Sequence, residues 1–542
     1  MKKKKKQLWT GYLWMVPVLS AVFLYLYHHL EPEKAITPQT AGIVILLSVC
    51  VTIYLGIEAG ARPGPSLPEK KKAMYPPVDK RMLFDHPEGV VFGKYHGKYV
   101  CRPLQEDGHI FLIGGSGSGK SSCLVIPTLL SNPNARIFAI DIKGELSFKS
   151  RKIGEENVVI FHPSDRDTFG YDPFFGLSKK SSSQQMVETM QQITFSLISL
   201  PAGLKDPFWK NSARNLLMGL LLYYYKAGMG DLVSIIDEIL GKPVKESVKT
   251  VMENASPRSA EYRYIVQFSD MEDETLSGVF AELANHLVIF SNDQDIRYAF
   301  KDNFRKMHPH MLEEGYSIYL SIPEEKLSAY YDVLQIILNQ TLAELEKRPE
   351  DSEPILFVMD EMPRIVSAGK LDRLLDGART LRSRKVILFL VTQSTEALMS
   401  AYTENEVADL ISNCPYIVVL SASSYKTQQS VIAWCGKYQE KRKSWSDSGK
   451  KKKLSISYED KDIVDAAGLM TLPETGDAIL ISPFGYSRIR KTPYYKESGL
   501  KEKAEVVMRY NRTVQRVREE TCKEKGTEEP EKQGPERVQD KD

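Results

Sequence analysis

Cysteine is scarce in this chain, with six residues among 542. The six are scattered along the sequence, and no two of them form a C-x-x-C pair. This pattern argues against a zinc site or a disulfide framework as the basis of the fold. The cysteine content instead fits a reducing compartment.

An excess of charge of one sign is also absent. Lysine and arginine number 72 against 70 aspartates and glutamates, so the formal net charge is +2. This balance identifies no partner, and any basic surface must therefore be local. No internal repeat is visible. The length exceeds that of one ordinary domain and allows a sizeable core.

The most informative stretch present is residues 114–121, GGSGSGKS, which matches the phosphate-binding loop G-x-x-x-x-G-K-[ST]. An apolar strand pattern precedes it and a helical pattern follows, as that motif requires. Lys120 is expected on the β- and γ-phosphates and Ser121 on Mg²⁺. A flexible Gly/Ser loop is the alternative, which the Lys-Ser pair disfavours. The expected ATP-binding residues are Gly114, Gly115, Ser116, Gly117, Ser118, Gly119, Lys120, Ser121 and Ser122.

A second motif follows the apolar strand pattern of residues 355–359, which ends in Asp360 and Glu361. A carboxylate at that place can hold Mg²⁺ through its water shell, so Asp360 is the expected metal residue beside Ser121. Glu361 is expected to polarise the water that attacks the γ-phosphorus. Taken alone, the Asp360–Glu361 pair is weak evidence for a nucleotide site, but after a phosphate loop in the same α/β domain it is strong evidence.

Gln393 follows the next strand pattern, residues 386–391. We expect it to sense the γ-phosphate or orient water; an amide that caps the strand is the alternative. Three arginines precede that strand, and we take Arg382 as the candidate arginine finger that acts across a subunit boundary. A solvated, basic helix end explains the three equally well.

The turn 141–145 follows another strand pattern, residues 136–140. Ligands bind at the carboxyl ends of strands in open α/β sheets, which makes Asp141 and Lys143 further candidates. A turn with a surface lysine is equally compatible with this spacing.

Strand and helix patterns alternate on both sides of a helix-rich stretch, which predicts a parallel α/β sheet with an inserted all-α domain. The expected parts are a linker, 61–88, a nucleotide-binding domain in two segments, 89–177 and 313–495, the all-α insertion, 178–312, and a charged, partly disordered tail, 496–542. Residues 441–453 are expected to form a basic loop around Trp445, suited to single-stranded nucleic acid or simply solvated.

Two uncharged runs, residues 8–27 and 41–57, stand near the N-terminus. Lysine and arginine are frequent on their outer flanks and rare between them, which predicts a two-helix transmembrane hairpin, residues 1–60, with both termini in the cytoplasm. A cleaved signal peptide and a buried helical hairpin are the alternatives.

Taken in order, these motifs resemble the type IV secretion coupling proteins of the TraG/TraD kind, which are related to septal DNA translocases. The resemblance covers about residues 8–495. It departs from the family at Ile142, where a proline is usual, and at Met362 and Pro363. It is carried by the phosphate loop, Asp141-Ile-Lys-Gly-Glu-Leu146, Asp206-Pro-Phe-Trp209, Tyr319-Leu-Ser-Ile-Pro323, Met359-Asp-Glu361 and Gln393-Ser394.

The resemblance implies a homohexameric, RecA-like ATPase in the bacterial inner membrane. Such a protein uses ATP and Mg²⁺ to deliver relaxase-bound single-stranded DNA, or proteins, to the channel components of a conjugative secretion system. Two alternatives stay open: a septal translocase of double-stranded DNA, and a substrate receptor that needs ATP only for assembly.

Overall fold

The structure, a computed structural model, describes residues 37–61, 75–155, 157–178, 180–200, 205–367, 369–447 and 452–526, with isolated positions between 17 and 29. The chain divides into two compact units, residues 1–73 and 74–542. The five cysteines whose state the structure describes are all free.

The first unit contributes the helix α3 (Pro38–Ala61). Within the part of the chain that the structure describes, no helix is long and apolar enough to cross a membrane. The first uncharged run, 8–27, lies mostly outside the described residues. The structure therefore does not support the transmembrane hairpin that the sequence predicts.

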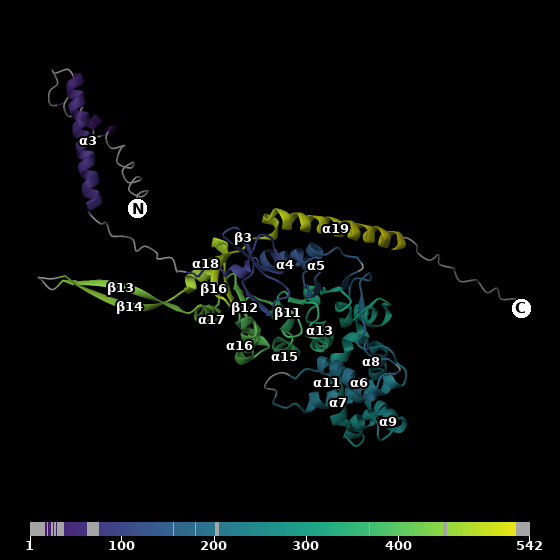
Figure 1. The fold of residues 1–542 in the computed structure, drawn as a ribbon. Helices are drawn as coiled ribbons and strands as arrows, with labels where there is room; N and C mark the ends of the chain where they lie inside the picture. The colour runs from purple at the N-terminus through teal and green to yellow at the C-terminus, as the bar shows by residue number, and fades with distance from the viewer. Residues whose placement is uncertain are drawn as a thin grey trace. The chain divides into compact units, whose positions relative to one another are not determined.

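Among the described residues of the second unit, one sheet of 12 strands organises the fold (Figure 1). The seven strands from β12 to β6 in the order below run parallel to one another, and the five strands before them pair in antiparallel fashion. From edge to edge the strands are β1 (Leu83–Phe84), β3 (Lys98–Arg102), β2 (Val90–Tyr95), β16 (Gly485–Arg490), β15 (Asp477–Ser482), β12 (Tyr416–Val419), β4 (Ile110–Ile113), β11 (Val386–Thr392), β10 (Ile355–Met359), β5 (Arg136–Ile140), β9 (Ser317–Leu320) and β6 (Val158–Phe161).

Apolar cores lie on both faces of this sheet because its central strands are apolar at successive positions. In β10, Phe357 belongs to one buried cluster and its neighbours Leu356 and Val358 to the other. Three helices cover one face: α4 (Ile126–Ser131), α5 (Glu145–Ser150) and α19 (Ser498–Gly526) (Figure 1). The opposite face is covered by α13 (Tyr331–Glu346), α14 (Met362–Val366), α15 (Asp372–Thr380) and α16 (Glu404–Ser412).

A helical subdomain is inserted between β7 (Gly170–Tyr171) and β8 (Lys306–Met307), which pair with each other in parallel. Between these two strands the described residues form helices and turns only. The insertion joins the core on the α13 side, where α6 packs against α13. Its helices are α6 (Ser183–Leu197), α7 (Phe208–Lys226), α8 (Leu232–Leu240), α9 (Val244–Asn254), α10 (Ala260–Ile265), α11 (Asp273–Asn292) and α12 (Gln294–Arg297).

Residues 437–447 and 452–462 depart from the sequence prediction of a basic loop at 441–453. They form a two-stranded antiparallel ribbon, β13 (Lys437–Asp447) and β14 (Lys452–Asp462), which pair with each other and with no other described strand. The ribbon projects from the sheet domain between α17 (Tyr425–Cys435) and α18 (Ala466–Thr475) (Figure 1). The alternation Leu454-Ser-Ile-Ser-Tyr458 is the strand signal that the basic composition concealed.

Two further segments pack on the sheet domain, which the sequence does not predict. Strand β1 lies inside the predicted linker 61–88, since Leu83 and Phe84 pair with β3. The predicted tail begins with α19, a helix of 29 residues that packs on α4 and α5. Leu500 and Ala504 are buried in that contact, so the first part of the tail belongs to the core.

Candidate functional site

The phosphate loop follows β4 at the carboxyl edge of the sheet, as its sequence context predicts. Its start is held by two backbone amides: Gly114 N donates to Thr392 O at 3.1 Å, and Gly115 N donates to Ser421 Oγ at 2.8 Å. Gly117 and Gly119 adopt φ angles of +73° and +95°. These left-handed conformations favour glycine and turn the loop around the helix that follows.

Lys120 and Ser121 lie at the end of this loop, where the helical turn η2 (Ser121–Val125) begins. Lys120 is buried, and its Nζ donates to Gly115 O at 3.3 Å. Burial lowers the pKa of its ammonium. Ser121 Oγ donates to Asp360 Oδ2 at 2.9 Å, although 239 residues separate the two in the chain. The fold thus joins the two motifs that the sequence singles out.

Asp360 follows β10 directly and faces the phosphate loop. Its second oxygen, Oδ1, is buried and receives no hydrogen bond from any described residue. Burial raises the pKa of this carboxyl to about 6. A cation at Oδ1 would satisfy the orphaned oxygen and offset the burial of charge.

The oxygen donors at this point fit Mg²⁺. Among the described residues no cluster of three or more His, Cys, Asp or Glu side chains could enclose a metal ion. Mg²⁺ does not need such a cage, since it keeps several waters and combines one or two protein oxygens with substrate phosphates. Ser121 and Asp360 supply that pair of protein oxygens.

Glu361 is the next residue, and its backbone has an unusual φ of +64°. Its Oε1 accepts a hydrogen bond from Lys143 Nζ at 2.6 Å, and its Oε2 lies 2.8 Å from Arg364 Nε. Burial alone would raise the pKa of Glu361, but Lys143, Arg364 and Lys120 together hold it below its ordinary value. Non-glycine residues with positive φ cost about 1–3 kcal/mol and cluster at functional sites.

The two candidates of the 141–145 turn have different roles in the structure. Asp141 is buried, and its Oδ2 accepts from the backbone N and the Oγ of Ser147 at 2.9 Å each. It therefore caps the first turn of α5. Lys143 is the residue of the turn that reaches Glu361.

Gln393 and Arg382 lie at opposite ends of β11. The strand runs between β4 and β10, so Gln393 follows it at the edge that carries the phosphate loop, with an exposed side chain. Arg382 precedes the strand and is exposed at the other edge of the sheet. The structure therefore brings Gln393, but not Arg382, to the site of its own chain; a finger acting across subunits stays a prediction.

Lys491 is a contact of the loop that sequence reasoning missed. It follows β16, and its Nζ donates to Ser118 O at 2.7 Å, while burial lowers the pKa of its ammonium. No motif surrounds Lys491 in the sequence. Only the antiparallel extension of the sheet brings it to the loop.

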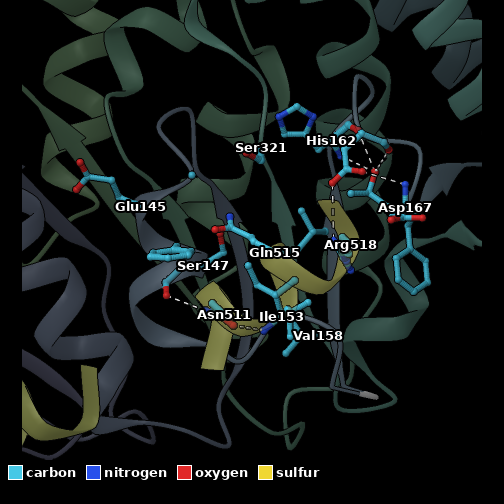
Figure 2. Close-up of a pocket in the computed structure, with 18 of the residues that line it drawn as sticks. Glu145, Ser147, Ile153, Val158, His162, Asp167, Ser321, Asn511, Gln515 and Arg518 are labelled. Carbon is cyan, nitrogen blue, oxygen red and sulfur yellow. Dashed lines mark hydrogen bonds and ion pairs between the residues drawn. The ribbon is translucent and has the colours of Figure 1, made fainter. Parts of the chain in front are cut away.

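A cavity of about 1090 Å³ adjoins the site on the side of α5 and the edge strand β6 (Figure 2). Lys143, Ser147 and Ser321 line it, and α19 contributes Asn511 and Arg518. None of residues 114–122 lines this cavity. The phosphate loop, defined by its own geometry, is therefore the better candidate for nucleotide binding.

Comparison with known proteins agrees with this geometry. The family described as Type IV secretory system Conjugative DNA transfer matches residues 67–523. The structure of the bacterial conjugative coupling protein TrwBdeltaN70, unbound, aligns with a TM-score of 0.59 at 17% identity, over 76% of this chain and 89% of that chain. No curated protein sequence matches the chain.

Two further TrwB structures contain nucleotide. TrwB with the non-hydrolysable ATP analogue ADPNP aligns with a TM-score of 0.58 at 16% identity, over 76% of this chain and 91% of that chain. TrwB with ADP and Mg²⁺ aligns at 0.59 and 15%, over 76% and 90%. At such identities these likenesses show a shared fold. The family match spans well over half of the sequence, so this chain belongs to the Type IV secretory system Conjugative DNA transfer family and is a coupling protein of type IV secretion.

Proposed function

We propose that this coupling protein is a membrane-anchored ATPase. It couples ATP hydrolysis to the recruitment and transfer of relaxase-bound single-stranded DNA, and of proteins, into a type IV secretion channel. One observation carries the hydrolase part of the proposal. The hydrogen bond of 2.9 Å from Ser121 Oγ to Asp360 Oδ2 unites the phosphate loop and the acidic strand end in one site, with Glu361 next to them.

The residues of the site have distinct roles in this proposal. Lys120 binds the β- and γ-phosphates, and the amides of the glycine loop bind the remaining phosphate oxygens. Ser121 and Asp360 hold Mg²⁺, which when bound neutralises charge on the phosphates. Glu361 takes the proton of the attacking water, and Gln393 reads the γ-phosphate. The TrwB structures with ADPNP and with ADP and Mg²⁺ support nucleotide and metal binding by this fold.

The cellular setting is also part of the proposal. The uncharged runs 8–27 and 41–57, with basic residues on their outer flanks, support an inner-membrane anchor with the ATPase domain in the cytoplasm. A homohexamer would bring a neighbour's Arg382 to each site, since within its own chain this arginine lies at the far edge of the sheet. The basic sequence of residues 441–453 supports a contact with single-stranded DNA.

Hydrolysis by the full-length protein tests the proposal. ATP turnover is measured with and without single-stranded DNA, beside the variants Lys120→Ala and Lys149→Ala. Lys149 is the matched control, because it pairs with Glu145 on α5 and does not contact the phosphate loop. We expect turnover that rises with DNA, falls at least about 100-fold in Lys120→Ala and is unchanged in Lys149→Ala.

Nucleotide binding without turnover, even with DNA and channel components present, would favour the receptor that uses ATP only to assemble. A preference for double-stranded DNA as the activator would favour the septal type of translocase. Glu361 argues against the receptor, since an adaptor has no need of a general base.

A further inference from the structure

Lys143 forms the shorter of the two ion pairs that Glu361 makes. Its Nζ donates to Glu361 Oε1 at 2.6 Å, and 218 residues separate the two in the chain. The side chain of Lys143 is half exposed, whereas that of Glu361 is nearly buried. The flexible lysine is therefore the member of the pair that can move.

The backbone that carries Lys143 is fixed. Gly144 N donates to Asp141 O at 3.0 Å, and Asp141 in turn caps α5 through Ser147. At the other end of α5, Asn511 of α19 donates to Phe148 O and Arg151 O at 2.8 Å each. A change of partner by Lys143 thus requires rotation of its side chain and no movement of the turn.

The pairing obstructs the role proposed for Glu361. A general base must offer a carboxylate oxygen to the water that it deprotonates. Lys143 takes Oε1, and the guanidinium of Arg364 stands beside Oε2. Arg364 also forms an ion pair with Glu324, so it is held in place by a second carboxylate. Lys143 has no described carboxylate partner other than Glu361, and its departure would free one oxygen.

A bound γ-phosphate would be a competing anion for Lys143. The charges of Glu361 and Asp360 both act on Lys143, and Lys143 in turn acts on Lys120. The ammonium of Lys143 therefore belongs to the charge cluster around the phosphate loop. A γ-phosphate held by Lys120 would carry more negative charge than the single carboxylate of Glu361.

We propose that Lys143 is a switching residue that pairs with Glu361 until a γ-phosphate is bound, and then moves to that phosphate and releases Glu361 for water. This inference rests on the proposed function, since it assigns a partner to the same site. It makes Lys143 a positioning residue for Glu361 and a sensor that distinguishes a nucleoside triphosphate from a diphosphate.

Binding of two nucleotides to the full-length protein tests the switch without turnover. We measure the dissociation constants of ADP and of a non-hydrolysable ATP analogue, each with Mg²⁺, for Lys143→Met, Lys143→Arg and the control Lys149→Met. Lys143→Met should weaken binding of the analogue about tenfold, the value of one hydrogen bond to a charged group, and leave ADP unchanged. Lys143→Arg should restore the preference for the ATP analogue over ADP, and Lys149→Met should retain that preference.

A double-mutant cycle of Lys143 and Glu361 provides a second test of the switch. Glu361→Gln removes the carboxylate that retains Lys143, so the analogue should bind more tightly in this variant. That gain should largely disappear in the double variant Lys143→Met, Glu361→Gln. Equal weakening of both nucleotides in Lys143→Met, or a gain from Glu361→Gln that is independent of Lys143, would overturn the switch.

The two proposals fail in different ways. A wild-type chain that binds both nucleotides through Lys120 but never hydrolyses ATP contradicts the ATPase, and the binding arms still decide the switch. A chain that hydrolyses ATP, with no selective effect of Lys143→Met on the analogue, contradicts the switch alone.

Discussion

The carboxyl edge of the sheet and the β13–β14 ribbon satisfy their polar groups in opposite ways. At the edge, Ser121 and Glu361 have partners that lie 239 and 218 residues away in the same chain. The described strands of the ribbon pair only with each other. Isolated two-stranded ribbons are marginally stable in water. The comparison teaches that the contacts joining the motifs of the nucleotide site form within one chain, whereas the ribbon has no described strand beyond its own two to stabilise it.

Asp360→Asn should have the largest effect, because it alters the edge where charge is buried. Residues that hold or orient a metal ion typically contribute about 10–100-fold to its affinity, so Mg²⁺-dependent binding of an ATP analogue should weaken by about that factor. The free energy of unfolding should change in the opposite direction.

Burial disfavours the ionised carboxylate and raises the pKa of Asp360 to about 6. The protonated carboxyl therefore favours the folded state at a pH below the ordinary aspartate pKa, and this contribution is lost as the pH rises through 6.

Without Mg²⁺, Asp360→Asn should therefore raise the free energy of unfolding at pH 7–8 by up to about 3 kcal/mol. The gain should vanish near pH 4. Chemical denaturation at several pH values measures it, with the exposed Asp376→Asn as control. A loss of stability at pH 8 would contradict the burial of an unsatisfied carboxylate at this edge.

Asn511→Ala tests the hydrogen bonds that fasten α19 to α5, and its effect on the free energy of unfolding should be intermediate. Asn511 is fully buried on α19; its Oδ1 accepts from Ile153 N at 2.8 Å, and its Nδ2 donates to the carbonyls of Phe148, in the last turn of α5, and of Arg151, just after it (Figure 2). Its loss leaves three backbone groups without that partner, which should cost about 2–3 kcal/mol in unfolding free energy. Amide exchange at Ile153 should accelerate.

The neighbouring exposed position provides the control for this variant. Arg512→Ala should change stability by less than about 0.5 kcal/mol. If Asn511→Ala proves as mild as Arg512→Ala, α19 is not fastened to α5 in the way that these hydrogen bonds indicate.

The ribbon should show the smallest effect on stability. Replacement of Lys441, Arg442 and Lys443 by glutamine should change the unfolding free energy by less than about 0.5 kcal/mol. Affinity for single-stranded DNA should fall, and the slope of log affinity against log salt should decrease by up to about 2, for three phosphate contacts. Fluorescence titrations at several salt concentrations measure both quantities.

A matched triple variant on α19 separates position from net charge. Lys501, Lys503 and Arg509 are exposed, and their replacement by glutamine removes the same charge. Equal losses of DNA affinity in the two triple variants would show that the ribbon has no special role.

Local motifs were predictable from the sequence, and long-range pairings were not. The phosphate loop and Asp360–Glu361 each follow a short apolar strand, so their chemistry could be assigned without the fold. The contact of Lys143 with Glu361 bridges 218 residues. From the sequence Lys143 was a site candidate or, equally, a surface lysine of a turn, and no partner could be assigned to it. Lys491 reached the loop through β16, a strand that its polar sequence conceals.

The charged C-terminal stretch shows how composition misled. Dense Lys, Arg and Glu after residue 496 predicted a tail, and these residues do lie mostly on the exposed side of α19. Three buried positions, Leu500, Ala504 and Asn511, recur at helical spacing and dock the helix. So few contacts are hard to distinguish from chance in a charged sequence.

The short β7–β8 pair has an evolutionary consequence. Because Gly170–Tyr171 and Lys306–Met307 lie side by side, the helical insertion leaves and rejoins the sheet domain at one point. Topologically it is an enlarged loop, and changes within it need not alter the order of the strands that hold the nucleotide site. Insertions, deletions and substitutions within this loop can therefore accumulate without displacing the strands that carry the phosphate loop and Asp360.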